Sequence, residues 1–86
     1  MFYLYVLKST IAPRHYIGIT ADITARLAYH NRGNVTSTKA YRPWKVAYSE
    51  AFERKTDARR RELSLKRTAK ARKELFTKID EAGPIV

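Results

Sequence analysis

A carboxylate interrupts the apolar face of a predicted basic helix, and its type suits a divalent cation. Residues 54–67 are expected to be helical, and one face at helical spacing carries Ala58, Glu62, Leu65 and Ala69. Held between basic residues and directed at a sheet, the carboxylate of Glu62 is a hard oxygen ligand for Mg²⁺ or Mn²⁺. The alternative is an exposed ion pair, because Arg59 precedes Glu62 by three residues and Lys66 follows it by four. The sequence leaves both interpretations open.

An arginine and a histidine share one side of the helix predicted just before Gly33. A helix over residues 21–32 would end at this glycine, which tolerates the left-handed conformation of a helix C-terminus. Arg26 and His30 lie four residues apart, so both side chains project toward whatever lies over the N-terminal strands. Ordinary roles also stay open: Arg26 as a solvated surface residue, and His30 as a residue that the helix dipole favours in the last turn.

The elements that position these side chains begin with two predicted strands joined by a turn. Residues 2–7 are apolar or aromatic at every position, which predicts a central strand covered on both faces. Residues 9–14 include turn-forming types, and residues 15–20 resume β character. The first two strands are therefore expected to form a hairpin.

Two tyrosines become neighbours in this hairpin if the strand register aligns their faces. Side chains alternate along a strand, so Tyr5 lies on one face of the first strand, while Tyr16 and Gly18 share one face of the second. An aromatic cross-strand pair can simply stabilise a sheet. Gly18 favours a functional interpretation, because a glycine within a strand often marks a position that a ligand or another backbone approaches closely.

The rest of the chain is expected to add a loop, a third strand and a last helix. Residues 34–43 have no sustained period and predict a loop, and residues 45–52 predict a strand. A helix over residues 71–81 is expected to stop at Gly83-Pro84. The inward face of this helix is predicted to carry Leu75, Phe76 and Ile79.

Composition limits the classes of protein to which the chain can belong. Its 86 residues make one small domain, expected to cover residues 1–81 with a tail over residues 82–86. No cysteine is present, which excludes disulfides and thiolate metal sites and fits a reducing compartment. The N-terminal apolar run is too short for a signal-peptide core or a membrane span, so a cytoplasmic protein with no membrane partner is expected.

A strong excess of positive charge indicates a polyanionic partner. Eighteen Lys and Arg residues against eight Asp and Glu residues give a formal net charge of +10, which favours binding to nucleic acid. A dense basic run covers residues 54–73, and within it Arg59 and Lys66 are expected to contact the phosphate backbone. A solvated charged face is the alternative explanation of this run.

Cationic and aromatic residues alternate around the start of the third predicted strand. Lys39, Arg42 and Lys45 are interleaved with Tyr41 and Trp44. Cations hold phosphate groups and flat rings stack on unpaired bases, so the three cations of this segment are expected to bind nucleic acid. The two aromatic residues can instead form part of a small core, which is the usual environment of large aromatic side chains.

Five segments, in their order and spacing, resemble the GIY-YIG nuclease domain, and specifically its small stand-alone bacterial members. They are Tyr3-Leu4-Tyr5, Tyr16-Ile17-Gly18, Arg26, His30 and Glu62 in its basic helix. The resemblance extends over residues 2–78. It implies an α+β fold in which a small three-stranded antiparallel sheet is flanked by about three helices. It also implies a single divalent metal, Mg²⁺ or Mn²⁺, that assists hydrolysis of a DNA phosphodiester bond.

The resemblance also assigns roles to individual side chains. It implies that Tyr5 or Tyr16 acts as general base on the attacking water. Arg26 matches the arginine that steadies the phosphate, His30 a histidine that assists proton transfer, and Glu62 the metal-binding glutamate. A free tyrosine has a pKa of about 10, so a tyrosine base needs help from nearby positive charge or from the metal.

The function implied is a metal-dependent endonuclease acting on nucleic acid, with DNA favoured over RNA and roles in DNA repair or recombination. Two positions depart from the family pattern. Tyr3 replaces the glycine of the first motif, and no asparagine follows Glu62, whereas larger members carry one late in the chain. Larger members append a separate DNA-binding domain, for which this chain is expected to have no length left, so substrate structure, a protein partner or dimerisation would set specificity. A non-catalytic nucleic-acid-binding module with the same fold is the alternative, and a ribosome-associated or RNA-processing factor is a third interpretation. The sequence leaves the oligomeric state open.

Overall fold

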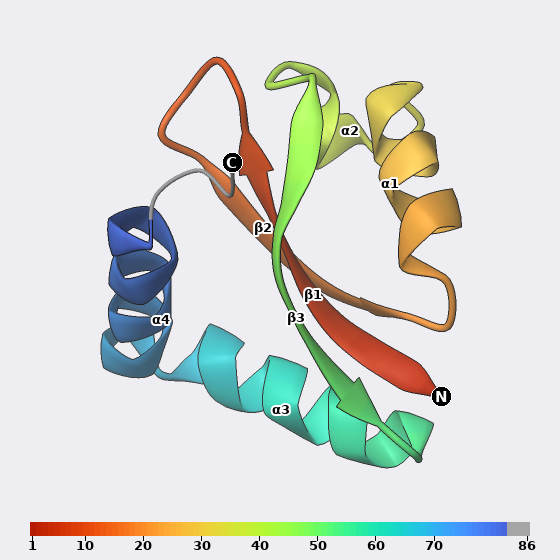
Figure 1. The fold of residues 1–86 in the computed structure, drawn as a ribbon, viewed down its shortest axis with the longest axis vertical. Helices are drawn as coiled ribbons and strands as arrows, with labels where there is room; N and C mark the ends of the chain where they lie inside the picture. The colour runs from red at the N-terminus through yellow and green to blue at the C-terminus, as the bar shows by residue number, and fades with distance from the viewer. Residues whose placement is uncertain (83–86) are drawn as a thin grey trace.

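The computed structural model describes residues 1–82 of the chain, and its sheet is built around the strand β1 (Phe2–Ser9). β2 (His15–Thr20) and β3 (Trp44–Phe52) pair antiparallel with β1 on either side, which gives the strand order β2-β1-β3 (Figure 1). Four consecutive residues of β1, Leu4, Tyr5, Val6 and Leu7, are buried, so both faces of the strand are covered. The predicted hairpin and central strand are confirmed.

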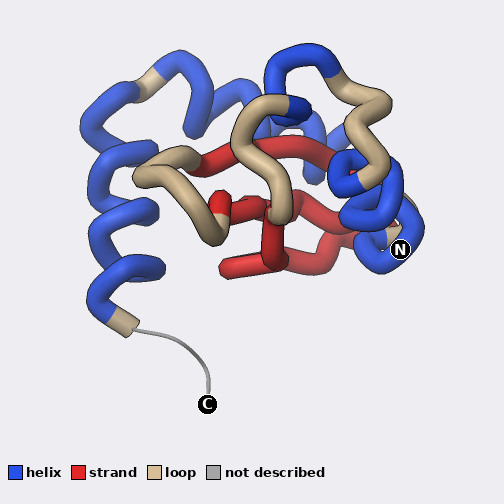
Figure 2. The backbone as a smooth tube through the Cα atoms, turned by 90° about the horizontal axis from the view of Figure 1, so that it is seen from above, coloured by secondary structure: helices blue, strands red, loops and turns tan. Residues whose placement is uncertain are grey.

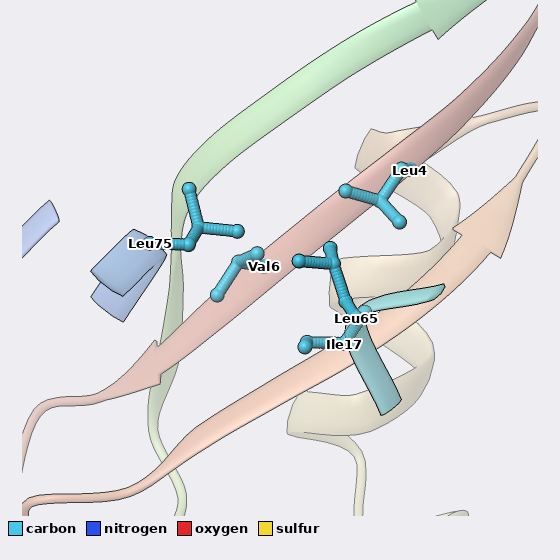
Figure 3. Packing of buried hydrophobic residues seen from close by; sticks show 5 residues of the cluster. All are labelled: Leu4, Val6, Ile17, Leu65 and Leu75. Carbon is cyan, nitrogen blue, oxygen red and sulfur yellow. The ribbon is translucent and has the colours of Figure 1, made fainter. Parts of the chain in front are cut away.

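One face of the sheet is covered by the two C-terminal helices, α3 (Lys55–Arg67) and α4 (Ala69–Glu81). Figure 1 shows α4 to the left of the sheet and α3 running below it. The buried apolar cluster on this face, drawn in Figure 3, consists of Leu4, Val6, Ile17, Leu65 and Leu75. Phe76 and Ile79 pack against the cluster, so the predicted inward face of the last helix is confirmed.

The opposite face of the sheet carries α1 (Ile23–Asn31) and α2 (Thr36–Lys39), which lie close together in Figure 1. The buried cluster on this face consists of Tyr5, Leu7 and Trp44. Ile23 and Leu27 of α1 pack against it. Figure 2, a view from above, shows helices on both sides of the three strands. A strand with apolar side chains at every position thus supplies a core to both faces.

The helix α2 lies within a segment that the sequence predicts to be a loop, and this part of the prediction is wrong. The backbone N–H groups of Thr38 and Lys39 donate to the carbonyl of Val35 at 3.2 and 3.0 Å, which closes a single turn. A helix of one turn is too short to show an apolar period. The other three helices appear where the sequence predicts them, with ends that differ by one or two residues.

No helix within residues 1–82 is long and apolar enough to cross a membrane. The predicted helix stop at Gly83-Pro84 and all but the first residue of the predicted tail over residues 82–86 lie outside the described residues. The division into a domain over residues 1–81 and a tail stays a prediction.

Candidate active site

The candidate site is centred on Tyr5, which β1 directs onto the face of the sheet that α1 covers. The residue directly opposite Tyr5 on β2 is Gly18, and Tyr5 is only 1% exposed. A Cβ atom added to Gly18 would lie 2.5 Å from the Tyr5 hydroxyl oxygen and 2.7 Å from the adjacent ring carbon. The group that approaches Gly18 is therefore the side chain of Tyr5, and the expectation of a ligand or another backbone there is corrected.

The hydroxyl of Tyr5 contacts two side chains of α1. Its oxygen lies 3.1 Å from Nε2 of His30 and accepts a hydrogen bond from Nε of Arg26 at 3.4 Å. His30 is fully buried, so its side chain points into the core instead of capping the last turn of the helix. The guanidinium of Arg26 also packs over the ring of Tyr29, 4.6 Å from the ring centroid. The four-residue spacing of Arg26 and His30 brings both onto one tyrosine.

Tyr16 lies beside this group on the edge strand β2. Its register partner on β1 is Leu7, so Tyr5 and Tyr16 are diagonal neighbours with ring centroids 6.3 Å apart. The Tyr16 ring also meets the His30 ring edge to face, with centroids 4.7 Å apart. Tyr5, Tyr16, Arg26 and His30 thus form one contiguous group on one face of the sheet.

Burial determines the protonation states at the centre of this group. It raises the pKa of the Tyr5 hydroxyl, and although the hydrogen bond from Arg26 lowers that pKa, nearby negative charge on Tyr16 or Glu62 adds to the rise. Burial also lowers the pKa of His30, and the positive charge of Arg26 lowers it further. At neutral pH the site therefore holds a neutral phenol hydrogen-bonded to a neutral imidazole.

Glu62, the fifth predicted site residue, lies on the buried face of α3 with Ala58 and Leu65. It is 4% exposed, and each carboxylate oxygen is paired with one cation of the same helix. Oε1 accepts from Arg59 at 2.5 Å, and Oε2 accepts from Lys66 at 3.2 Å. The two interpretations of Glu62 are both partly right, because the carboxylate is ion-paired but faces the sheet and is buried.

Comparison with known proteins assigns the family. Residues 1–75 match the family model described as the GIY-YIG catalytic domain. The chain belongs to the GIY-YIG family. GIY-YIG domains are typically nucleases, they bind nucleic acid, and they generally use divalent metals. Tyr5 on β1 and Tyr16 on β2 both lie within the matched residues.

Similar proteins include several UPF0213 proteins. The chain is 40% identical over 75 residues to the UPF0213 protein of Streptococcus pneumoniae serotype 4, covering 86% of this chain and 75% of that protein. It is 33% identical to UPF0213 protein VNG_2274C of Halobacterium salinarum, with coverages of 86% and 96%. The solution NMR structure of UPF0213 protein BH0048 from Bacillus halodurans has a TM-score of 0.56 and 28% identity, covering 98% of this chain and 89% of that one. The α+β fold with a three-stranded antiparallel sheet is that of a GIY-YIG domain.

The carboxylate of Glu62 suits a hard divalent cation that would take its other ligands from water and substrate. Within residues 1–82 no three His, Cys, Asp or Glu side chains cluster as a ready-made metal site. Mg²⁺ commonly binds proteins through one or two carboxylates and completes its coordination with water and substrate phosphates. Glu62 fits that pattern as a single carboxylate, provided that a metal replaces Arg59 or Lys66 at one of its oxygens.

The cations predicted to bind nucleic acid differ in their surroundings. Lys39 and Lys45 are exposed. Arg42 donates through Nε to the carbonyl of Lys39 at 2.8 Å and through Nη1 to the carbonyl of Asn31 at 3.5 Å, so it also braces the segment around α2. Trp44 is 4% exposed, and its indole N–H donates to the carbonyl of Thr38 at 2.8 Å. Trp44 is therefore a core residue, whereas Tyr41 is half-buried against the same cluster and has the guanidinium of Arg14 over its ring.

Two residues that support the site were missed by sequence reasoning. Thr38 is 1% exposed, and its hydroxyl oxygen lies 2.9 Å from Nδ1 of His30. Asn31 accepts from the backbone N–H of Trp44 at 2.7 Å and donates to its carbonyl at 3.1 Å, which ties α1 to β3. The sequence carries no local signal for either contact, because each joins two elements through folding alone.

Proposed function

We propose that the chain is a divalent-metal-dependent endonuclease that hydrolyses phosphodiester bonds of nucleic acid, with DNA preferred over RNA. The observation that carries the proposal is the hydrogen-bonded series Arg26, Tyr5 and His30, built on the two motif strands of a GIY-YIG domain with Tyr16 beside it. The cation of Arg26 can bind a phosphate, and the hydroxyl of Tyr5 and the neutral imidazole of His30 can transfer a proton beside it.

The proton path of the proposed reaction runs through Tyr5 to His30. The attacking water gives a proton to the Tyr5 oxygen while the hydroxyl proton of Tyr5 passes to Nε2 of His30, which becomes imidazolium. The hydroxide formed in this way bonds to phosphorus, the bond from phosphorus to the leaving oxygen breaks, and the leaving oxygen departs as an alkoxide that takes a proton from solvent water. Tyr5 begins and ends as a neutral phenol, so its raised pKa does not hinder the step.

Positive charge accounts for the rest of the proposed mechanism. Arg26 uses Nε for Tyr5, and the terminal nitrogens of its guanidinium are suited to a phosphate oxygen. Glu62 would hold Mg²⁺ or Mn²⁺, which when bound supplies Lewis-acid stabilisation of the charge that develops on the phosphate. The net charge of +10 supports attraction of a polyanion, and we place the protein in the cytoplasm in DNA repair or recombination.

A non-catalytic nucleic-acid-binding module is the second candidate, and one observation favours it. Both oxygens of Glu62 are already paired with Arg59 and Lys66, so the carboxylate has a structural partner without any metal. On this account Glu62 only orders two basic side chains. Nucleic acid would bind, and no phosphodiester bond would break.

Metal-dependent cleavage by variants of Glu62 separates the two candidates. Labelled single strands, nicked duplex, flaps, branched junctions and structured RNA are incubated with Mg²⁺ or Mn²⁺ and with wild type, Glu62→Gln or Glu74→Gln. Glu74 is an exposed carboxylate of α4 and serves as the matched control. The nuclease proposal predicts cleavage that Glu62→Gln lowers at least about 100-fold and Glu74→Gln leaves intact. Binding without cleavage by wild type on every substrate would favour the binding module.

A further inference from the structure

The positions of the protons around Tyr5 follow from which groups can donate and which can accept. A guanidinium has only donors, so Arg26 donates to the Tyr5 oxygen. In the part of the chain that the structure describes, the other hydrogen-bonding partner of this oxygen is Nε2 of His30. The hydroxyl hydrogen of Tyr5 therefore points at Nε2, which must carry a lone pair and no hydrogen.

The far side of the imidazole gives the same answer independently. The hydroxyl oxygen of Thr38 lies 2.9 Å from Nδ1 of His30 and 3.3 Å from the carbonyl oxygen of Val35. A carbonyl can only accept, so the hydroxyl of Thr38 donates to Val35 and accepts from Nδ1–H. Both ends of the series thus require a neutral His30 with its hydrogen on Nδ1.

We propose that Thr38 is a positioning residue that keeps the hydrogen of His30 on Nδ1 and so leaves Nε2 free to take the proton of Tyr5. The role in catalysis rests on the proposed function, whereas the tautomer does not. The hydrogen bond at one ring nitrogen determines what the other nitrogen can do. Thr38 reaches Tyr5 only through His30.

Thr38 is held firmly enough to have this effect. It is almost completely buried, and its backbone carbonyl accepts the indole N–H of Trp44. Trp44 is itself fixed by both backbone hydrogen bonds to the side chain of Asn31. Thr38 is therefore anchored to α1 and to its own turn by its hydroxyl, and to β3 by its backbone carbonyl.

The groups that face His30 also keep it neutral. Tyr5 and Tyr16 pack against its ring, and the charge of Arg26 disfavours an imidazolium. Without the hydroxyl of Thr38, an Nδ1–H group would be buried with no acceptor. Moving the hydrogen to Nε2 would relieve that cost, because Nε2–H can donate to the Tyr5 oxygen, but the Tyr5 hydroxyl would then lose its acceptor on the ring.

Nitrogen NMR of the histidine rings tests the tautomer without any activity. In protein labelled with ¹⁵N at histidine, wild type and Thr38→Ser are expected to show a pyrrole-type Nδ1 and a pyridine-type Nε2 at His30. Thr38→Val has nearly the same volume and no hydroxyl, and it is expected to shift signal toward an Nε2–H form. His15, on the opposite face of the sheet beside Asp80, provides an internal reference that should not change. An Nε2–H tautomer in wild type, or the same tautomer in Thr38→Val as in wild type, would overturn the proposal.

Single-turnover cleavage then tests the role in the reaction. Thr38→Val is expected to lower the rate of the chemical step by roughly 10- to 100-fold with nucleic-acid affinity unchanged, and Thr38→Ser to restore it. A shifted tautomer with an unchanged rate would refute the positioning role. If wild type cleaves nothing, the proposed function fails, and the NMR result still decides whether Thr38 sets the tautomer.

Discussion

Tyr5 and Gly18 act as a pair, because the strand register places the phenol ring where a side chain of Gly18 would be. The ring passes over the glycine and reaches Arg26 and His30 on α1. A larger residue at position 18 is incompatible with that path. The glycine is therefore required by the geometry of another side chain, and its own backbone conformation is not the reason.

Gly18→Ala should harm both stability and activity. The added methyl group overlaps the Tyr5 hydroxyl and the ring carbon beside it, so the buried ring must shift away from its contacts with Arg26 and His30. We expect a loss of about 1–3 kcal/mol in the free energy of unfolding, measured by urea denaturation, and cleavage lowered as strongly as in Tyr5→Phe. If Gly18→Ala had both the stability and the cleavage rate of wild type, the Tyr5 ring would not need the space over Gly18.

His30 should make stability depend on pH below neutrality. Burial and the charge of Arg26 lower its pKa, so the unfolded chain takes up a proton more readily than the folded chain. Above the ordinary histidine pKa of about 6.5 this difference in pKa does not reduce the free energy of unfolding. As pH falls below that value, the free energy of unfolding decreases by up to about 1.4 kcal/mol per pH unit. The lowered pKa values of Glu50 and Asp80 matter only at lower pH, below about 4 to 5.

The measurement for His30 compares slopes, not absolute stabilities. Wild type and His30→Gln are unfolded with urea between about pH 7 and pH 5, the window in which an ordinary histidine titrates. His15 is present in both proteins and affects both curves. We expect the stability of wild type to fall more steeply with acidification than that of His30→Gln. Parallel curves would mean that His30 is not held neutral by the fold.

At the scale of elements, contacts between α1, α2 and β3 could not be predicted from the sequence. The period of apolar residues predicts where α1, α3 and α4 lie, and the apolar run predicts that β1 is central. The period of apolar residues also places Glu62 on the inward face of α3. The carbonyl of Thr38 in α2 accepts the indole N–H of Trp44 in β3, a contact that joins two separate elements. Local patterns contain no information about such pairs.

Asn31 should be the main polar connection between α1 and β3. Its side chain forms two hydrogen bonds with the backbone of Trp44, at 2.7 and 3.1 Å. Asn31→Ala leaves both backbone groups without this partner, and we expect it to cost about 1–3 kcal/mol of unfolding free energy in thermal or urea denaturation. Asn34→Ala, at an exposed position, should change stability by less than about 0.5 kcal/mol. Equal effects of the two changes would contradict this role of Asn31.

At the scale of the whole molecule, the fold class could be predicted from the sequence. Which site residues lie over each face of the sheet could not. Apolar or aromatic residues at every position of residues 2–7 are enough to predict two covered faces. This pattern does not tell that α1, with Arg26 and His30, covers one face and α3, with Glu62, the other, or that the charge of Glu62 still acts on Tyr5. Helical spacing offers the pairing of Glu62 with Arg59 and Lys66 as one of two interpretations, and the structure forms both ion pairs. No local pattern tells that Arg42 also braces α2.

Binding to nucleic acid should be strongly dependent on salt. Phosphate neutralisation releases counterions, so the logarithm of the association constant should fall linearly with the logarithm of salt concentration. Lys39→Ala, on α2, should reduce the magnitude of this slope by about 1, measured by fluorescence anisotropy. Lys78→Ala, on α4 across the sheet, is the control and should leave the slope unchanged. Equal slopes for all three proteins would exclude Lys39 from the contact surface.

The most direct measurement is single-turnover cleavage of a labelled DNA junction by wild type, Tyr5→Phe and Tyr3→Phe in Mg²⁺ or Mn²⁺. Tyr3 lies two residues before Tyr5 on the same face of β1, so its variant is a matched control. Tyr5→Phe removes the hydroxyl that joins Arg26 to His30 and should slow cleavage by about 100-fold or more, with DNA affinity unchanged. Tyr3→Phe should cleave at close to the wild-type rate. Cleavage by Tyr5→Phe at the wild-type rate would contradict the proposed site.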